Sequence, residues 1–228
     1  MMPQHTDRAY EQALDQLRTS VLEMGGLVED QIAQAVRALV DRDPALAQAV
    51  VTRDHTVNRL DVEIDDLCIK LLALHQPAGR DLRLITTALK ITTDLERIGD
   101  LAAHVAERTL ELAAEPALKP YIDIPRMADL TRDMLHQSLD AFVREDSDLA
   151  LKVCAADDGV DKLHEQVFRE LLSYMVEDPH TISRAMRLLF VSKALERIGD
   201  HATNIAEMVI FMAKGRSIRH LDRLPREL

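Results

Sequence analysis

Two copies of one hexapeptide hold the residues of this chain that are best suited to chemistry. The string Leu-Glu-Arg-Ile-Gly-Asp occurs twice, with the second copy 100 residues after the first. In the first copy Glu96 and Asp100 are four residues apart, so on an α-helix their carboxylates stand one turn apart on the same face. Glu196 and Asp200 repeat this spacing. Oxygen ligands of this kind suit hard cations, so the repeat predicts two related metal sites.

Helical spacing also predicts which side of each acidic helix is buried. The acidic stripe continues through His104 and Glu107 in the first copy and through Asn204 and Glu207 in the second. The opposite side of the first helix carries apolar or small side chains, namely Leu95, Ile98, Ala102, Val105 and Thr109. The acids are therefore expected to form a column on the outer face of an amphipathic helix rather than a buried cluster.

A second polar stripe lies on the helix that precedes each hexapeptide. It consists of Asp54, Asn58, Asp61 and Asp65 in the first half, and of Asp157, Asp161 and His164 in the second. Antiparallel neighbours would place this stripe beside the Glu-xxx-Asp column, where like charges destabilise the fold unless cations or solvent screen them. Two interpretations stay open: a carboxylate site for a divalent or trivalent metal ion, or two solvated acidic faces, which are the ordinary setting of Asp and Glu.

Apolar residues at helical spacing, interrupted by turn residues, predict six long helices. Gly25-Gly26 interrupts the first pattern and indicates either a close helix contact or a kink. Asp43-Pro44 is expected to cap and begin the second helix, and Ser147 to cap the fifth. A cluster of prolines marks the junction between two halves: Pro116, Pro120 and Pro125. The expected helices cover residues 7–39, 43–74, 80–114, 125–144 and 147–176, with a sixth that follows Asp178-Pro179 and ends near Gly215.

The sequence repeat extends beyond the hexapeptide and indicates a duplicated architecture. At an offset of 103 residues, Val50, Asp54, Val57 and Leu60 correspond to Val153, Asp157, Val160 and Leu163. Only 7 glycines, no tryptophan and abundant Ala, Leu, Glu and Arg fit an all-helical chain. We therefore predict an all-α fold, a tandem repeat of two three-helix bundles with six long antiparallel helices. The expected domains are residues 7–115 and 124–215, followed by a polar tail at 216–228.

Charge and composition exclude several classes of function. The 39 acidic and 28 basic residues give a net charge of −11, which argues against nucleic acid as a partner. No apolar stretch approaches the ~18 residues of a membrane span, and no signal-peptide region is recognisable, so a cytoplasmic chain that is not membrane-embedded is expected. Cys68 and Cys154 are interpreted as reduced core thiols. No phosphate-binding loop or nucleophile motif is present, so enzymatic activity is not expected.

These motifs resemble those of the PhoU family, the accessory regulators of bacterial phosphate-specific transport. The resemblance rests on the two hexapeptides, on residues 75–83 (His-Gln-Pro-Ala-Gly-Arg-Asp-Leu-Arg) and on residues 199–207 (Gly-Asp-His-Ala-Thr-Asn-Ile-Ala-Glu). The family's fold, a tandem pair of three-helix bundles, agrees with the periodicity. Its Glu/Asp-xxx-Asp metal signature implies the ligands Glu96, Asp100, Glu196, Asp200, Asp157, Asp161, Asp54 and Asn58. Asn58 stands where the signature has an acid, and its carbonyl oxygen can still ligate.

The resemblance also implies the biology. A PhoU-type protein is a cytoplasmic homodimer and a negative regulator of the phosphate-starvation (Pho) response, and it modulates phosphate uptake. Its implied partners are a sensor histidine kinase and the ATPase subunit of the phosphate ABC transporter, which would hold it at the inner face of the membrane. Its implied cofactors are divalent or trivalent metal ions (iron, manganese, zinc or magnesium). The alternative is a helical protein that stores metal or performs metal-dependent hydrolysis.

Overall fold

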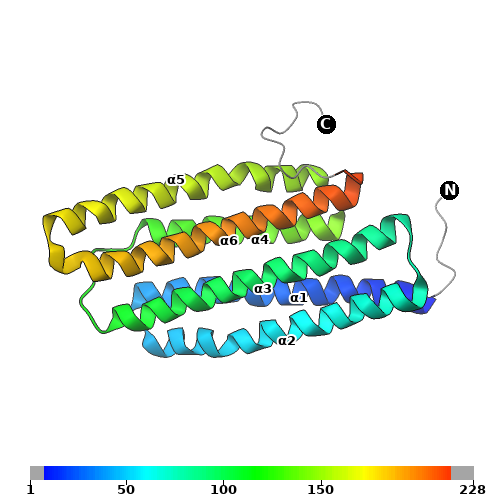
Figure 1. Ribbon diagram of the computed structural model, residues 1–228, viewed down its shortest axis with the longest axis horizontal. Helices are drawn as coiled ribbons and strands as arrows, with labels where there is room; N and C mark the ends of the chain where they lie inside the picture. Colours follow the sequence, from blue (N-terminus) through cyan, green and yellow to red (C-terminus); the bar gives the residue numbers. More distant parts are fainter. Residues whose placement is uncertain (1–7, 217–228) are drawn as a thin grey trace.

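Six long α-helices make up the protein in the computed structural model, which describes residues 8–216 (Figure 1). They are α1 (Arg8–Asp41), α2 (Pro44–His75), α3 (Gly79–Ala113), α4 (Asp123–Arg144), α5 (Ser147–Glu177) and α6 (Ile182–Lys214), with a short 3-10 turn, η1 (Pro179–Thr181), before the last. The prediction of an all-α chain with six long helices is confirmed. None of these helices combines the length and apolarity needed to cross a bilayer. The predicted tail, apart from Arg216, lies outside the described residues.

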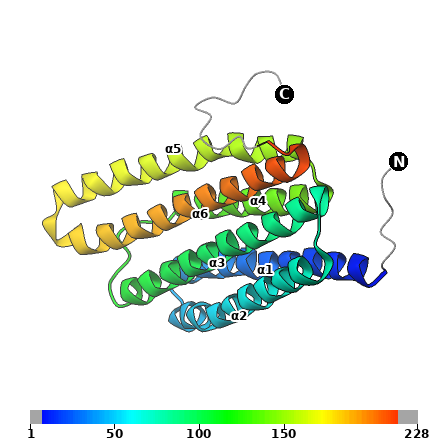
Figure 2. The same cartoon turned by 45° about the vertical axis from the view of Figure 1, so that its right-hand side comes forward.

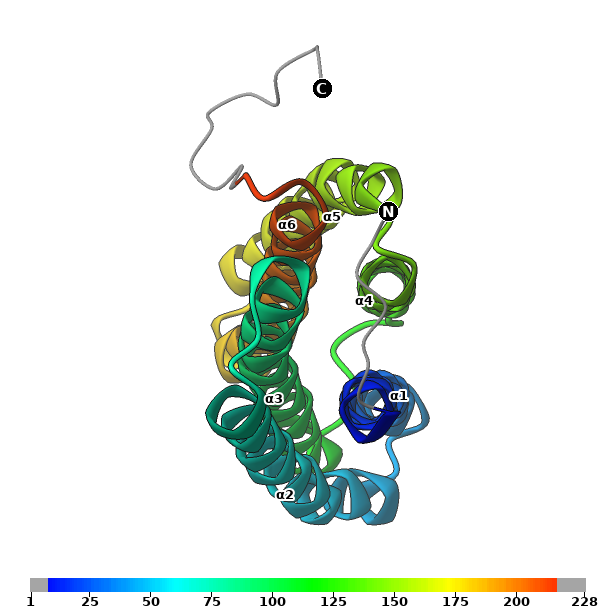
Figure 3. The ribbon, with the colours of Figure 1, turned by 90° about the vertical axis from the view of Figure 1, so that its right-hand side faces the viewer.

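The helices are stacked in two layers that follow the long axis of the molecule. Figure 3 shows α2, α3, α6 and α5 side by side in a curved layer, with α1 and α4 against one face of it. The three helices of each half pack on one another, and contacts between α3 and α6 and between α1 and α4 join the halves. The two bundles therefore lie side by side (Figure 2), and α3 and α6 run antiparallel through the centre.

Aspartates begin two of the long helices, and one predicted cap is wrong. Asp43 has an extended backbone, and its carboxylate accepts hydrogen bonds from two N–H groups in the first turn of α2. Asp146 does the same for α5. Ser147, the predicted cap, is instead the first helical residue, because the aspartate before it supplies the acceptor that the exposed N–H groups require. Gly215 follows α6 in the left-handed conformation, with φ of 67°, as a C-cap glycine does.

One apolar core extends through both halves. It includes the buried side of each hexapeptide helix: Leu95, Ile98, Ala102 and Val105 of α3, with Leu195, Ile198 and Ala202 of α6, all at most 1% exposed. Burying an aliphatic side chain of the size of Leu or Ile contributes about 1.5–3 kcal/mol. The core thus fixes the rotation of α3 and α6 about their axes, and so determines which side of each hexapeptide is left for its neighbour.

Gly25 marks a close contact between α1 and α4. The helix α1 continues through both glycines without interruption. A Cβ on Gly25 would collide with the side chain of Leu139 in α4, whereas a Cβ on Gly26 would meet nothing within 4 Å. Of the two explanations left open for this pair, the close contact is therefore the one present. It is one of the points at which the two halves approach each other.

Candidate metal centres

The first hexapeptide, on α3, faces the polar stripe of α2 across a space left by Gly99. A Cβ on Gly99 would stand 3.4 Å from Oδ1 of Asp54, so the missing side chain is what lets this carboxylate lie against α3. Asn58 turns toward the same carboxylate and donates from Nδ2 to Oδ2 of Asp54 over 3.1 Å. The structure thereby brings the predicted pair on α2 beside the predicted pair on α3, Glu96 and Asp100.

Burial and like charge raise the pKa values in this first site. For both Asp54 and Glu96 burial is the larger cause, and the charge of Asp100 is the next. The hydrogen bond from Asn58 acts on Asp54 in the opposite direction. The side chains of Glu96 and Asp100 are 24% and 34% exposed. The expectation of an outer-face column is therefore wrong for Glu96 and Asp100, which lie partly buried between α2 and α3, whereas His104 further along the same stripe is exposed.

The second hexapeptide meets α5 in the same way. Gly199 lies against Asp157, whose Oδ1 is 3.3 Å from the position that a Cβ would take. Burial raises the pKa of Asp157 from its ordinary 3.8 to about 6, and the charges of Asp200 and Asp161 are the next causes. Burial and then Glu196 raise the pKa of Asp200. All four acids predicted for the second site therefore influence one another across α5 and α6.

The first site offers oxygen atoms of the kind that bind hard cations, and some of these oxygens have no hydrogen-bond partner. The buried atoms Oδ1 of Asp54 and Oδ1 of Asn58 have no hydrogen-bond partner, and neither has the buried amide of Gln31 from α1. Unpartnered buried oxygens are costly, and a bound hard cation would satisfy them. The side chains stand apart, however: residues 8–216 contain no group of three or more His, Cys, Asp or Glu already placed to hold an ion. Binding would therefore require these side chains to converge.

Basic side chains accompany both sites. Arg97 lies 3.5 Å from both Glu96 and Asp100 of its own helix. In the second site Lys193 lies 2.5 Å from Glu196. These pairs offset part of the negative charge, so the acids can be this close without a cation, and a cation would compete with Arg97 and Lys193 for the same oxygens.

Two polar residues at these sites are missed by the sequence analysis. Gln31 is only 4% exposed, and its Oε1 lies 3.2 Å from the position that a Cβ of Gly99 would take. A polar residue on the buried side of an amphipathic helix is the signal that could have identified it. Thr203 contacts Asp157 and lowers its pKa. It lies one turn after the second hexapeptide, and nothing in the local sequence distinguishes it.

A family model described as "PhoU domain" matches residues 21–109 and 124–209, which are the two halves of the chain. The phosphate-specific transport system accessory protein PhoU homolog of Pseudomonas putida is 42% identical over 218 residues, which cover 95% of this chain and 85% of that protein. The phosphate-specific transport system accessory protein PhoU of Escherichia coli K12 is 36% identical over 217 residues, with 95% of this chain and 90% of that protein covered.

Two solved structures share the fold over almost their entire length. The crystal structure of PhoU from Pseudomonas aeruginosa aligns with a TM-score of 0.87 and 43% identity, and covers 91% of this chain and 100% of that one. The phosphate transport system regulatory protein PhoU from Streptococcus pneumoniae aligns with a TM-score of 0.85 and 28% identity, with 92% and 99% covered. With both halves matched in sequence and six helices matched in space, this chain belongs to the PhoU family, whose curated relatives are accessory proteins of the phosphate-specific transport system.

Proposed function

We propose that this chain is a negative regulator of the phosphate-starvation response and acts as an adaptor, not as an enzyme. The observation that carries the proposal is its similarity, over nearly the whole chain, to accessory proteins of phosphate-specific transport. The adaptor binds the ATPase subunit of the phosphate ABC transporter and a sensor histidine kinase, and holds kinase signalling off when phosphate is plentiful. A long two-layered body offers a separate face to each partner (Figure 3).

The adaptor works in the cytoplasm as a homodimer and reaches the inner face of the membrane through its partners. Support for self-association comes from an apolar stripe at helical spacing on α5, formed by Phe168, Leu172 and Val176, which are 47%, 45% and 76% exposed. Exposed apolar surface of this kind is typical of a protein interface.

Metal ions at the two sites join α2 to α3 and α5 to α6. The ligands are Asp54, Asn58, Glu96 and Asp100 in the first site, and Asp157, Asp161, Glu196 and Asp200 in the second. A cation supplies positive charge where clustered carboxylates repel one another, so its binding stabilises the pairing of the two helices. Iron, manganese, zinc and magnesium are the candidate ions.

A deletion strain tests the regulatory role. With phosphate plentiful, loss of the gene is expected to raise alkaline phosphatase activity, since kinase signalling is no longer held off, and the full-length chain supplied from a plasmid should restore repression. Continued repression in the deletion strain would overturn the proposal.

Elemental analysis of protein purified without chelator tests the metal sites. The double variant Glu196→Ala, Asp200→Ala is expected to lose the metal of the second site. Asp129 and Asp133 have the same spacing but are exposed on α4, so the matched control Asp129→Ala, Asp133→Ala should retain it. Wild-type protein without bound metal would overturn the site assignment and leave the adaptor role standing. Metal lost with repression intact would favour the second candidate function, metal storage.

A further inference from the structure

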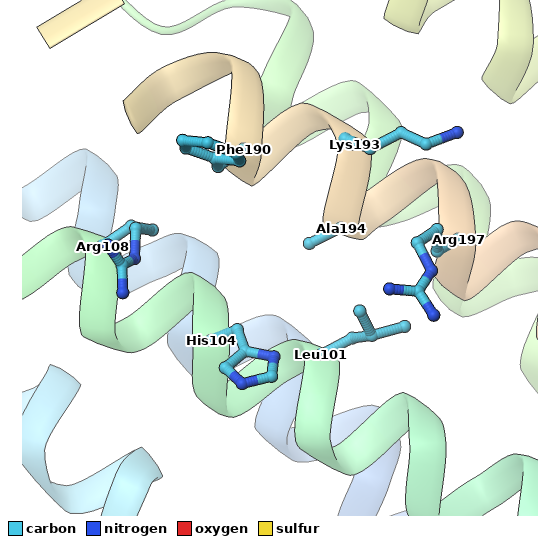
Figure 4. A pocket seen from close by; sticks show the side chains of 7 residues that line it. All are labelled: Leu101, His104, Arg108, Phe190, Lys193, Ala194 and Arg197. Carbon is cyan, nitrogen blue, oxygen red and sulfur yellow. The ribbon is translucent and has the colours of Figure 1, made fainter. Parts of the chain in front are cut away.

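A pocket of about 370 Å³ lies between α3 and α6, where the two halves meet (Figure 4). Leu101 and Ala194 form its apolar floor and are 6% and 8% exposed, and Phe190 at its edge is 57% exposed. The remaining lining residues are all nitrogen bases or cations: His104, Arg108, Lys193 and Arg197. The volume is in the range of small-molecule sites, and no acidic side chain is among the residues that line the pocket, although the chain has a net charge of −11.

Arg197 is the cation that the fold leaves available in this pocket. Arg108 pairs with Glu111 at 2.6 Å, and Lys193 pairs with Glu196. Among the described residues Arg197 has neither an ion pair nor a hydrogen bond, and Figure 4 shows its guanidinium extending from α6 into the space beside Leu101. The repeat supplies a direct comparison, because Arg97 at the equivalent position is paired with two carboxylates of its own helix.

The internal repeat also shows which chemical group occupies the position equivalent to this pocket on the other side of the α3–α6 junction. Because α3 and α6 are antiparallel copies of one helix, each pair of positions at which they meet has a counterpart pair at an offset of 100 residues, and the residues at the two pairs can differ. On one side of the junction Asp94 of α3 is 2.7 Å from Nδ1 of His201, and it also accepts from Asn204 over 3.4 Å. The counterpart of Asp94 is Ala194, so a carboxylate occupies one side, and the other side is the pocket.

We propose that this pocket binds a small organic anion. Its acidic group, a carboxylate, sulfonate or phosphate, sits above Ala194 within reach of Arg197 and His104, in the place that Asp94 fills on the other side. Such groups accept hydrogen bonds from the N–H groups of guanidinium and of imidazole, and those from guanidinium are charge-assisted and strong. The apolar body of the ligand packs on Leu101 and on the ring of Phe190. The ligand would contact both halves of the chain, and the inference is independent of the regulatory role proposed above.

Fluorescence titration of the full-length protein with 8-anilinonaphthalene-1-sulfonate, an aryl sulfonate, tests this site. One probe molecule is expected per chain, and N-phenyl-1-naphthylamine, the same framework without the sulfonate, should bind at least about ten-fold more weakly. The variant Ala194→Asp installs the carboxylate of the other side and should abolish binding. Arg197→Ala should weaken it by about ten-fold or more, since one charge-assisted contact is lost.

Arg97→Ala is the matched control, because it removes the equivalent arginine of the other half, and it should leave the affinity for the sulfonate unchanged. Circular dichroism checks that each variant is folded, and Arg197→Ala alone carries the test if Ala194→Asp does not fold. Affinity that is unchanged in Arg197→Ala, equally reduced in Arg97→Ala, or equal for the two probes would overturn the proposal.

Discussion

Asp54 and Asp157 occupy equivalent positions in the two halves, and each holds a carboxylate against a glycine of the next helix. Partial removal from water next to other acids makes the charged form of each less stable. The two sites differ in the residue one turn further along. Asn58 donates a hydrogen bond to Asp54, whereas Asp161 adds negative charge beside Asp157. The second site therefore depends more strongly on protons or cations than the first.

Replacing Asp157 by Asn in chelator-treated protein is expected to stabilise the fold at neutral pH. The pKa of Asp157 in the folded protein, about 6, lies above its ordinary 3.8, so the folded state binds the proton more tightly than the unfolded state does. The contribution of Asp157 to the stability of the folded state is favourable below pH ~4 and is lost as the pH rises through about 6. The free energy of unfolding of Asp157→Asn should therefore be about 1 kcal/mol larger than that of the wild type at pH 7.5, after allowance for solvent screening.

Urea denaturation between pH 5 and 8 measures this difference, which should narrow as the pH falls through about 6. Asp158→Asn, at the exposed neighbouring position on α5, is the control and should show no such pH dependence. A constant difference between Asp157→Asn and the wild type across this range would contradict the prediction.

The acids of both sites can be identified from spacing alone, because a helix repeats its faces at fixed intervals and the duplication supplies a second copy. Their depth cannot. Helical spacing places Glu96 on the outer face of its own helix, and it is partly buried only because α2 covers it. Gln31 joins the first site from α1 through a contact between residues far apart in the chain. A polar residue on the buried side of α1 can mark Gln31 as unusual, but no local pattern encodes which site it joins or that α2 covers Glu96.

At the scale of the helix, the order and type of all six elements follow from apolar periodicity, whereas their ends depend on local chemistry. α4 begins at Asp123, two residues before the predicted start, because Pro125 needs no N–H partner within the first turn. α1 passes through Gly25-Gly26, since about 1 kcal/mol per glycine is small beside the burial of a 34-residue amphipathic helix. Which of the two glycines is required depends on Leu139 of α4, and the sequence of α1 cannot specify that.

Substitution of these adjacent glycines by Ala is expected to have opposite effects on stability. Gly26→Ala should stabilise the protein by up to ~1 kcal/mol, because the methyl group meets nothing within 4 Å and alanine favours the helix. Gly25→Ala should destabilise it by ~1 kcal/mol or more, because Leu139, only 3% exposed, would have to move within the core. Thermal unfolding followed by circular dichroism compares the two, and equal shifts of Tm in the same direction would refute the assignment of Gly25 to the α1–α4 contact.

At the scale of the whole molecule, the two halves share one core and are joined through α3 and α6. Asp94 and His201 hold this junction together with a polar contact that the sequence analysis does not find. Each half has its own helices and its own acidic site, yet the apolar sides of α3 and α6 are covered in part by the other half. The repeat in the sequence predicts the two units, and it does not predict how they are placed side by side.

Both halves are therefore expected to unfold in one transition. Each has one free cysteine, Cys68 in α2 and Cys154 in α5, and burial raises the pKa of each thiol to about 12, so neither reacts readily at pH 8 while folded. Brief alkylation with iodoacetamide at increasing urea, read by mass spectrometry, should give the same midpoint for both cysteines and for the loss of helical circular dichroism. Midpoints that differ between the two cysteines would show that the halves unfold independently.

The two sides of the α3–α6 junction carry different residues at equivalent positions. A duplicated chain can have this difference, and a symmetric dimer of half-length chains cannot. Identical subunits related by a twofold axis must carry the same residue at both equivalent positions, so they would have either two bridges or two pockets. Covalent fusion of the copies removes this constraint, because each position then mutates separately. Here Asp94 bridges the halves on one side, and Ala194 leaves space on the other. The duplicated chain can thus join its halves through the contact of Asp94 and keep a pocket at the same junction. A symmetric dimer of half-length chains could not combine the two.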